Sequence, residues 1–128
     1  MTAKLTRRSV LKTAAAAGIA APFFLSDAHA KPSETLLHAS FGAAGMAGSD
    51  IGSLTASKHV RLVAVAEVDD ARTADIRKRF PNVRIYQDWR VLLDKEKELT
   101  SVNVSTPDHM HAPITMRAMQ QGLHVYTQ

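Results

Sequence analysis

The sequence of 128 residues contains no cysteine, which excludes disulfide bonds, zinc sites with thiolate ligands and a cysteine nucleophile. It also lacks an uninterrupted apolar run of ~20 residues, the length that a transmembrane helix needs, and it contains no internal repeat. Hydrophobic residues make up 45% of the chain and charged residues 22%, so the chain can build a hydrophobic core and is not disordered throughout. This length supports one domain of ordinary size.

The positive charge of the chain is concentrated at its N-terminus. The formal net charge is +4 and the isoelectric point is about 9.7, a balance that can indicate a nucleic acid or anionic membrane partner. Residues 1–30 hold four of the basic residues and one acidic residue, which leaves 12 basic and 11 acidic residues in the rest of the chain. Residues 31–128 therefore carry a net charge of +1 with no basic stripe, and the sequence does not support binding to nucleic acid.

Residues 1–30 have the three parts of an export signal. A basic start leads into an apolar, alanine-rich run over residues 13–25, and residues 28–30 read Ala-His-Ala, a typical cleavage site. Residues 6–12, TRRSVLK, resemble the twin-arginine motif, Ser/Thr-Arg-Arg-x-apolar-Leu-Lys. We therefore expect a twin-arginine signal peptide that directs export by the Tat machinery to the periplasm or another extracytoplasmic space. The alternative is an N-terminal amphipathic or anchoring helix.

The rest of the chain reads as a short linker over residues 31–34 followed by alternating strands and helices. The run VRLVAVA over residues 60–66 is almost entirely apolar, as expected of a strand buried on both faces. This alternation with short connections predicts an α/β fold with a doubly wound parallel sheet covered by helices on both faces. The predicted strands are 35–41, 60–66, 83–86, 101–106 and a last one from 124; the predicted helices follow the first strand to about residue 57 and then occupy 71–80, 89–93 and 112–121.

A glycine cluster joins the first predicted strand to the first helix. Gly42, Gly45 and Gly48 fit a G-x-x-G-x-x-G spacing, whereas a G-x-G-x-x-G frame from Gly42 has Ala44 and Ala47 at its second and third glycine positions. Glycines in this context permit a tight turn and close approach of the backbone to a pyrophosphate at the helix N-terminus. The cluster indicates a dinucleotide site, and an ordinary strand-to-helix turn is the alternative.

An acidic residue follows the second predicted strand. Glu67 lies 25 positions after Gly42, where a dinucleotide-binding fold places the carboxylate that accepts hydrogen bonds from the adenosine ribose. A carboxylate there repels a 2′-phosphate, which favours NAD over NADP. We expect Asp69 or Asp70 to cap the next helix; the alternative for Glu67 is that it belongs to the same polar loop.

The segment STPDHMHAP, residues 105–113, follows another strand, at the end where ligands bind in open α/β sheets. His109 and His111 could suggest a metal pair, but zinc needs a third ligand, and no cysteine or suitably placed carboxylate supplies one. We therefore predict no metal; either histidine could instead cap or pack the helix. Four other side chains are expected to pack in the core: Phe80, Trp89, Met116 and Met119.

The glycine-rich turn, the segment VAVAEVDD and the segment FPNVRIYQDWRVLLDKEKELTSVNVSTPDHMHAPITMRAMQQGLHVYTQ together resemble the N-terminal Rossmann domain of the glucose–fructose oxidoreductase/inositol dehydrogenase (Gfo/Idh/MocA) family. The resemblance runs from about residue 35 to residue 128. It implies an NAD(P)-dependent oxidoreductase that acts by hydride transfer on a sugar, a polyol or a related compound. In the family, a second domain supplies much of the substrate pocket and usually the oligomer interface, so the resemblance implies a truncated Rossmann domain over residues 35–128 whose parent protein is a homo-oligomer.

The resemblance also implies roles for individual residues. Thr106, Pro107 and His111 match the Thr/Asn-Pro-x-x-x-His element that lines the cofactor, and Gln128 falls on the glutamate of the Glu-Lys-Pro motif. The lysine of that motif would follow Gln128, so we expect no catalytic residue in this chain and no hydride transfer by the chain alone. The expected cofactor-binding residues are Gly42, Ala44, Gly45, Met46, Glu67, Thr106, Pro107, His109, His111 and Gln128.

Three other interpretations remain open at this stage. A relative of NAD-dependent glycosidases would use NAD as a transient hydride acceptor, and a non-catalytic fragment would only bind the nucleotide. The dihydrodipicolinate reductase family shares the glycine spacing, but it lacks the Thr-Pro-Asp-His element and is not exported.

Overall fold

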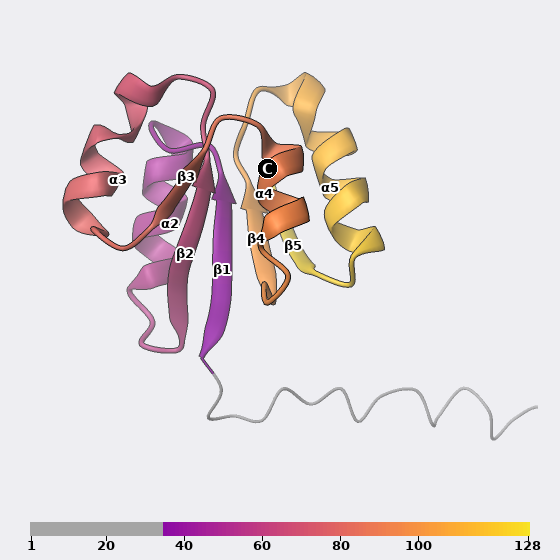
Figure 1. Cartoon of the computed structure of the whole chain (residues 1–128), viewed down its shortest axis with the longest axis horizontal. Coiled ribbons are helices and arrows are strands. Elements are labelled where there is room, and N and C mark those ends of the chain that lie inside the picture. The colour runs from indigo at the N-terminus through magenta and orange to yellow at the C-terminus, as the bar shows by residue number, and fades with distance from the viewer. Residues whose placement is uncertain (1–34) are drawn as a thin grey trace, which may run out of the picture. The chain divides into compact units, whose positions relative to one another are not determined.

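The computed structural model describes residues 35–128, so the predicted signal peptide (1–30) and linker (31–34) lie outside the described residues. Within the described part, one parallel sheet has the strand order β3-β2-β1-β4-β5 (Figure 1). The order along the sheet reverses at β1, because β2 pairs with one edge of β1 and β4 with the other. The strands are β1 (Leu36–Phe41), β2 (Val60–Ala66), β3 (Arg84–Tyr86), β4 (Ser101–Val104) and β5 (His124–Thr127).

Helices cover both faces of this sheet. One core cluster joins the sheet to α2 (Met46–Thr55) and α3 (Ala74–Arg79), and a second joins its other face to α4 (Trp89–Lys95) and α5 (His111–Gln120) (Figure 1). Short 3₁₀ helices, η2 (Asp70–Thr73) and η3 (Asp108–Met110), precede α3 and α5. The predicted doubly wound parallel sheet is therefore confirmed.

Strand β1 shows how the two faces differ. Ala39 and Phe41 are fully buried against the cluster that includes α4 and α5. Successive side chains of a strand point to opposite faces, so the equally buried His38 and Ser40 lie on the other face. Polar side chains are thus buried in the middle of the sheet.

The expectation that Met116 and Met119 lie in the core is wrong, because they are 58% and 59% exposed. Helix α5 instead buries Ile114 and Ala118, which are four positions apart and share one face of a helix with 3.6 residues per turn. Met116 lies about 200° around the helix from Ile114 and so points away from the sheet.

The strand predicted for residues 101–106 ends at Val104. The ladder continues for one more hydrogen bond, from the N–H of Ser105 to the carbonyl of Phe41 at 3.0 Å. Beyond it, Pro107 has no N–H to donate to a ladder, and its carbonyl accepts from Met110 at 2.8 Å as η3 begins. The turn leaves Thr106 and Pro107 in a loop above the sheet.

An ion-paired cluster ties β3 to the C-terminal end of α4. Glu96 accepts two hydrogen bonds from the Arg84 guanidinium and one, at 2.6 Å, from the Tyr86 hydroxyl. Hydrogen bonding to Arg84 lowers the pKa of Glu96. None of these three side chains lines the pocket described below, and we assign the cluster a structural role.

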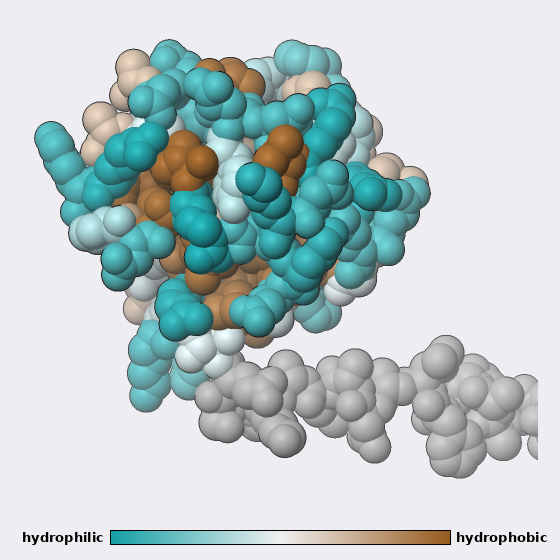
Figure 2. All heavy atoms as spheres, in the orientation of Figure 1, coloured by the Kyte–Doolittle hydropathy of each residue, from teal (hydrophilic) through white to brown (hydrophobic). Residues whose placement is uncertain are grey.

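The side of the molecule that carries α4 has a mainly hydrophilic surface, with hydrophobic residues visible between polar ones near its centre (Figure 2). Among residues 35–128, no helix combines the length and the apolar character needed to cross a membrane.

Candidate dinucleotide site

A cavity of about 730 Å³ opens at the carboxyl ends of β1, β2 and β4. Its walls include Phe41 at the end of β1, Ala66 at the end of β2 and Ser105 just beyond β4. This is the point at which the strand order reverses, and ligands of open α/β sheets bind at such points. The cavity is large enough for a small molecule or a cofactor portion.

The glycine turn forms one side of this cavity. Gly42 has a φ of +105°, and a Cβ atom at this position would lie 2.7 Å from the carbonyl oxygen of Ser105 and 2.8 Å from the Cβ of Ala47. Gly45 has a φ of +61° and precedes α2 without a side-chain cap. The first turn of α2 carries no acidic residue, so its N–H groups and the positive end of the helix dipole are available to an anion.

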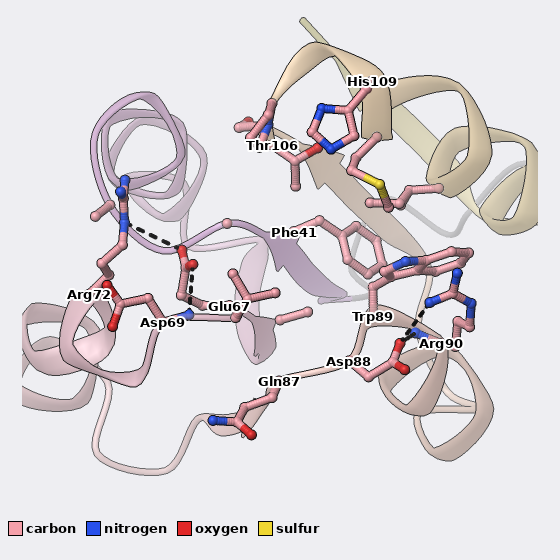
Figure 3. Close-up of a pocket in the computed structure, with 18 residues that line it drawn as sticks. Phe41, Glu67, Asp69, Arg72, Gln87, Asp88, Trp89, Arg90, Thr106 and His109 are labelled. Carbon is pink, nitrogen blue, oxygen red and sulfur yellow. Dashed lines mark hydrogen bonds and ion pairs between the residues drawn. The ribbon is translucent and has the colours of Figure 1, made fainter.

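Glu67 lies beside this turn with its carboxylate partly engaged (Figure 3). One oxygen accepts from the N–H of Ala43 at 3.1 Å and the other from the N–H of Asp69 at 3.3 Å. A carboxylate offers about four acceptor positions, so the remaining lone pairs can accept from two hydroxyls of a ribose. The side chain is only 11% exposed, and the two N–H groups fix its orientation.

Asp69 caps the segment that follows, as expected. Its side chain accepts from the N–H of Ala71 at 3.0 Å at the start of η2. The cap holds η2 at the edge of the cavity, and Arg72 of η2 lines the wall close to Glu67 (Figure 3).

The opposite wall is aromatic and includes Phe41 and Trp89 (Figure 3). Trp89 packs against the core, as expected, but it also lines the cavity. The Arg90 guanidinium lies 4.5 Å from the centre of the indole ring, on which cations are attracted to the π-face. The indole Nε1 is buried without a hydrogen-bond partner in the described part of the chain. An aromatic wall of this kind suits the flat ring of a nucleotide base.

The loop after β4 closes the third side of the cavity. His111 Nε2 donates to the carbonyl oxygen of Thr106 at 2.6 Å, which links the loop to the start of α5. Thr106, Pro107 and His109 line the cavity. The Thr106 hydroxyl is buried, and residues 35–128 supply no partner for it, so it can hydrogen-bond to a bound ligand.

The structure thus brings most of the expected cofactor-binding residues to one cavity: Gly42, Ala44, Glu67, Thr106, Pro107 and His109 line it. The other four lie around it. Gly45 and Met46 form the start of α2, His111 supports the loop through Thr106, and Gln128 lies at the end of β5. Their roles toward a cofactor stay predictions. Across residues 35–128, histidine, aspartate and glutamate side chains form no group that could hold a metal ion.

Sequence reasoning missed a chain of buried and partly buried polar groups that ends beside the glycine turn. His38 Nδ1 lies 2.8 Å from the Ser101 hydroxyl, and its Nε2 lies 2.9 Å from Asn103 Oδ1. Asn103 Nδ2 donates to the Ser105 hydroxyl at 2.9 Å, and this hydroxyl donates to Asp50 at 2.5 Å. The polar alternation of His38 and Ser40 in β1 was a signal for a buried polar face.

The Asp50 carboxylate fixes the direction of this chain. A carboxylate only accepts, so Ser105 donates to Asp50 and must accept from the amide nitrogen of Asn103. The amide oxygen of Asn103 then faces His38, so Nε2 of His38 carries the proton and Nδ1 accepts from Ser101. Burial lowers the pKa of His38, against a smaller opposing effect of its hydrogen bond to Asn103, which keeps the imidazole neutral.

Asp50 also connects this chain to the end of β5. Gln128 Nε2 donates to both carboxylate oxygens of Asp50, at 3.1 and 3.3 Å. A glutamate at position 128 would bring a second negative charge to Asp50, whereas the amide of Gln128 supplies a donor. The neutral amide of Gln128 is therefore compatible with the adjacent Asp50 carboxylate.

The fold and the site together define a dinucleotide-binding domain of the Rossmann type. The chain belongs to the Gfo/Idh/MocA family, because the family model described as "Oxidoreductase family, NAD-binding Rossmann fold" matches residues 38–127. The expected cofactor, NAD, is confirmed by this match.

Individual relatives match a part of their own length. Levoglucosan dehydrogenase of Pseudarthrobacter phenanthrenivorans is 31% identical over 61 residues, which cover 48% of this chain and 15% of that protein. The solved structure of GenD2 from gentamicin A biosynthesis, in complex with NAD, is 29% identical with a TM-score of 0.66, and the match covers 73% of this chain and 26% of that one. Biliverdin reductase from Synechocystis sp. PCC 6803, in complex with biliverdin and NADP⁺, is 25% identical with a TM-score of 0.64, over 72% of this chain and 28% of that one. The chain therefore spans between about a seventh and little more than a quarter of the length of these relatives.

Proposed function

We propose that this chain is the cofactor-binding part of an exported oxidoreductase that transfers a hydride between NAD and a sugar, a polyol or a related compound. The observation that carries the proposal is the placement of Glu67 beside an open glycine turn, with acceptor positions free for a ribose. The name of the curated relative, levoglucosan dehydrogenase, supports a sugar-related substrate. The parent protein is proposed to be a homo-oligomer whose further residues bind the substrate.

The residues of this chain bind and orient the cofactor. The backbone at Gly42 and Gly45 and the N-terminus of α2 receive the pyrophosphate, and Glu67 holds the ribose. The aromatic wall at Trp89 excludes water from one side of the cavity. NAD supplies the nicotinamide that accepts or returns a hydride; the protein supplies its position and its electrostatic surroundings.

The substitution Glu67→Ala is expected to weaken NAD binding about tenfold, because the ribose loses an ionised acceptor. Binding is measured from the indole N–H signal of Trp89 in ¹H–¹⁵N spectra, since Trp89 is the only tryptophan of the chain and lines the cavity. The matched control is Asp94→Ala, which removes a carboxylate that is 65% exposed and is not part of the cavity lining.

Wild-type protein that gives no change in this signal at millimolar NAD would refute the proposal. Equal affinities for the Glu67→Ala and wild-type proteins would show that Glu67 does not hold the ribose. The same titration with NADP measures the preference for NAD over NADP that Glu67 sets. In the Glu67→Ala protein, the difference in affinity between the two cofactors is expected to be smaller than in the wild type.

Export is tested separately in a bacterium with a twin-arginine pathway. Changing Arg7 and Arg8 together to lysine is expected to leave the protein in the cytoplasm with residues 1–30 attached, because the pathway recognises the arginine pair. Cell fractionation and the mass of the recovered protein give the result. The control changes Lys4 to arginine, and export of the double-lysine protein at the normal level would contradict the proposed route.

A further inference from the structure

Arg72 is a cation at the cavity wall that lacks a close partner. Its Nε lies 3.8 Å from Glu67 Oε2, its side chain is 53% exposed, and within the described residues its guanidinium makes no hydrogen bond. Arg77, five positions later, behaves differently: its guanidinium lies 2.6 Å from Asp70 and its Nε donates to Thr73 at 2.9 Å. Arg72 thus keeps its donors available at the edge of the cavity.

The free end of Arg72 reaches toward the glycine turn. Its terminal nitrogen lies 4.0 Å from the point that a Cβ of Gly45 would occupy, just before the uncapped N-terminus of α2. The guanidinium therefore lies between the carboxylate of Glu67 and the backbone donors of the turn. A planar guanidinium with several donors is the side chain best suited to phosphate oxygens.

The charge of the cavity supports the same assignment. Arg90 is the other lysine or arginine side chain of its lining, and it is stacked on Trp89 and bonded to Asp88 at 3.4 Å. A pyrophosphate brings two negative charges, which the backbone of a glycine turn only partly balances. Arg72 is the one of these two cations that reaches the turn.

We infer that Arg72 binds the pyrophosphate of the dinucleotide and exchanges its long contact with Glu67 for phosphate oxygens. This inference rests on the proposed function, because it concerns the same site. Glu67 Oε2 keeps its hydrogen bond from the Ala43 N–H, and the exchange leaves its second acceptor position open to the ribose, so one movement prepares both subsites. We assign Arg72 to the pyrophosphate and not to a 2′-phosphate, because the neighbouring Glu67 repels an anion on the ribose while the guanidinium points to the turn.

The test compares ligands with and without phosphates on the full chain. The Trp89 indole signal is followed in titrations with NAD, ADP and adenosine for the wild type, Arg72→Gln, Arg72→Lys and the control Lys78→Gln. Lys78 is exposed and forms no ion pair within the described part of the chain, so its variant removes the same charge away from the cavity.

Arg72→Gln is expected to weaken ADP and NAD about tenfold, the effect of losing a charged hydrogen bond, and to change adenosine binding less than about twofold. The affinity of Arg72→Lys for ADP and NAD is expected to lie between those of the wild type and Arg72→Gln, because lysine keeps the charge and loses the planar fork. Lys78→Gln is expected to bind all three ligands as the wild type does. Unchanged ADP and NAD affinity in Arg72→Gln overturns the inference alone, as does an equal loss of affinity for adenosine. Absence of any binding by the wild type overturns the proposed function and this inference together.

Discussion

The substitution Gly42→Ala is expected to lower the free energy of unfolding by about 3 kcal/mol and to remove detectable NAD binding. Two causes act together. The φ of +105° is unfavourable for a residue with a Cβ, and this Cβ would meet the Ser105 carbonyl oxygen at 2.7 Å and the Ala47 Cβ at 2.8 Å. Both contacts are closer than the atoms tolerate, so position 42 must move apart from Ser105, just beyond β4, and from the start of α2. That shift displaces the turn that receives the pyrophosphate.

Gly122→Ala separates these two causes. Gly122 also has a positive φ, +79°, but no atom lies within 4 Å of the position that a Cβ would occupy. The Gly122→Ala variant is therefore destabilised by backbone strain of about 1 kcal/mol, without a clash. Thermal unfolding followed by circular dichroism is expected to show a fall of roughly 15 °C for Gly42→Ala and of about a third of that for Gly122→Ala. Equal shifts would mean that strain alone, and not the approach of β4 and α2, requires glycine at position 42.

The fold could be predicted because its signals are local. The apolar run of β2 and the glycine and proline punctuation between segments each report the state of a few consecutive residues. The rule that parallel strands need crossover helices then supplies the doubly wound arrangement. The failure at Met116 and Met119 has the same origin: composition gave the helix, but the face of α5 that meets the sheet depends on its rotation, which is set by the tertiary packing of Ile114 and Ala118.

The site could be predicted only where a residue acts through its own segment. Gly42 and Glu67 stand directly after strand ends, so their place at the sheet edge followed from the sequence. Trp89 reaches the cavity because α4 crosses back over the sheet, and its aromatic character alone does not distinguish a cavity wall from core. Arg72 is one of several arginines after β2, and only the position of η2 separates it from Arg77.

The buried polar chain shows why pairing register matters. Parallel pairing places His38 opposite Ser101 and Ser40 opposite Asn103, although each pair is separated by 63 residues along the chain. Considered in one strand alone, such a polar residue only weakens the apolar pattern of that strand and gives no sign of its partner. His38, Ser101 and Asn103 satisfy one another across the two strands, while Ser40 donates to the carbonyl oxygen of Gly42.

The substitution His38→Leu is expected to lower the free energy of unfolding by about 2 kcal/mol at neutral pH. Leucine fills a similar volume, but it leaves Asn103 Oδ1 without its donor, and Asn103 is fully buried. His59→Leu is the control, because His59 is exposed and surface substitutions change stability by no more than about 0.5 kcal/mol. Urea unfolding measures both variants, and a His38→Leu protein as stable as the wild type would show that the polar chain contributes nothing net.

The free energy of unfolding of His38→Leu relative to the wild type depends on pH, and this dependence tests the protonation state of His38. Burial lowers the pKa of the folded imidazole, while in the unfolded chain the same group takes up a proton near pH 6.5. Below that pH the unfolded state binds a proton that the folded state does not, so the stabilisation that the neutral His38 gives is complete above the unfolded pKa and is lost as the pH falls toward the folded pKa. The leucine variant has no such group, and its deficit relative to the wild type is therefore expected to shrink between about pH 7.5 and about pH 5.5. A constant deficit would mean that burial does not lower the pKa of His38 in the folded protein. A deficit that grows over this range would mean that the folded imidazole binds a proton more tightly than the unfolded one and that Nδ1 donates to Ser101 instead of accepting from it.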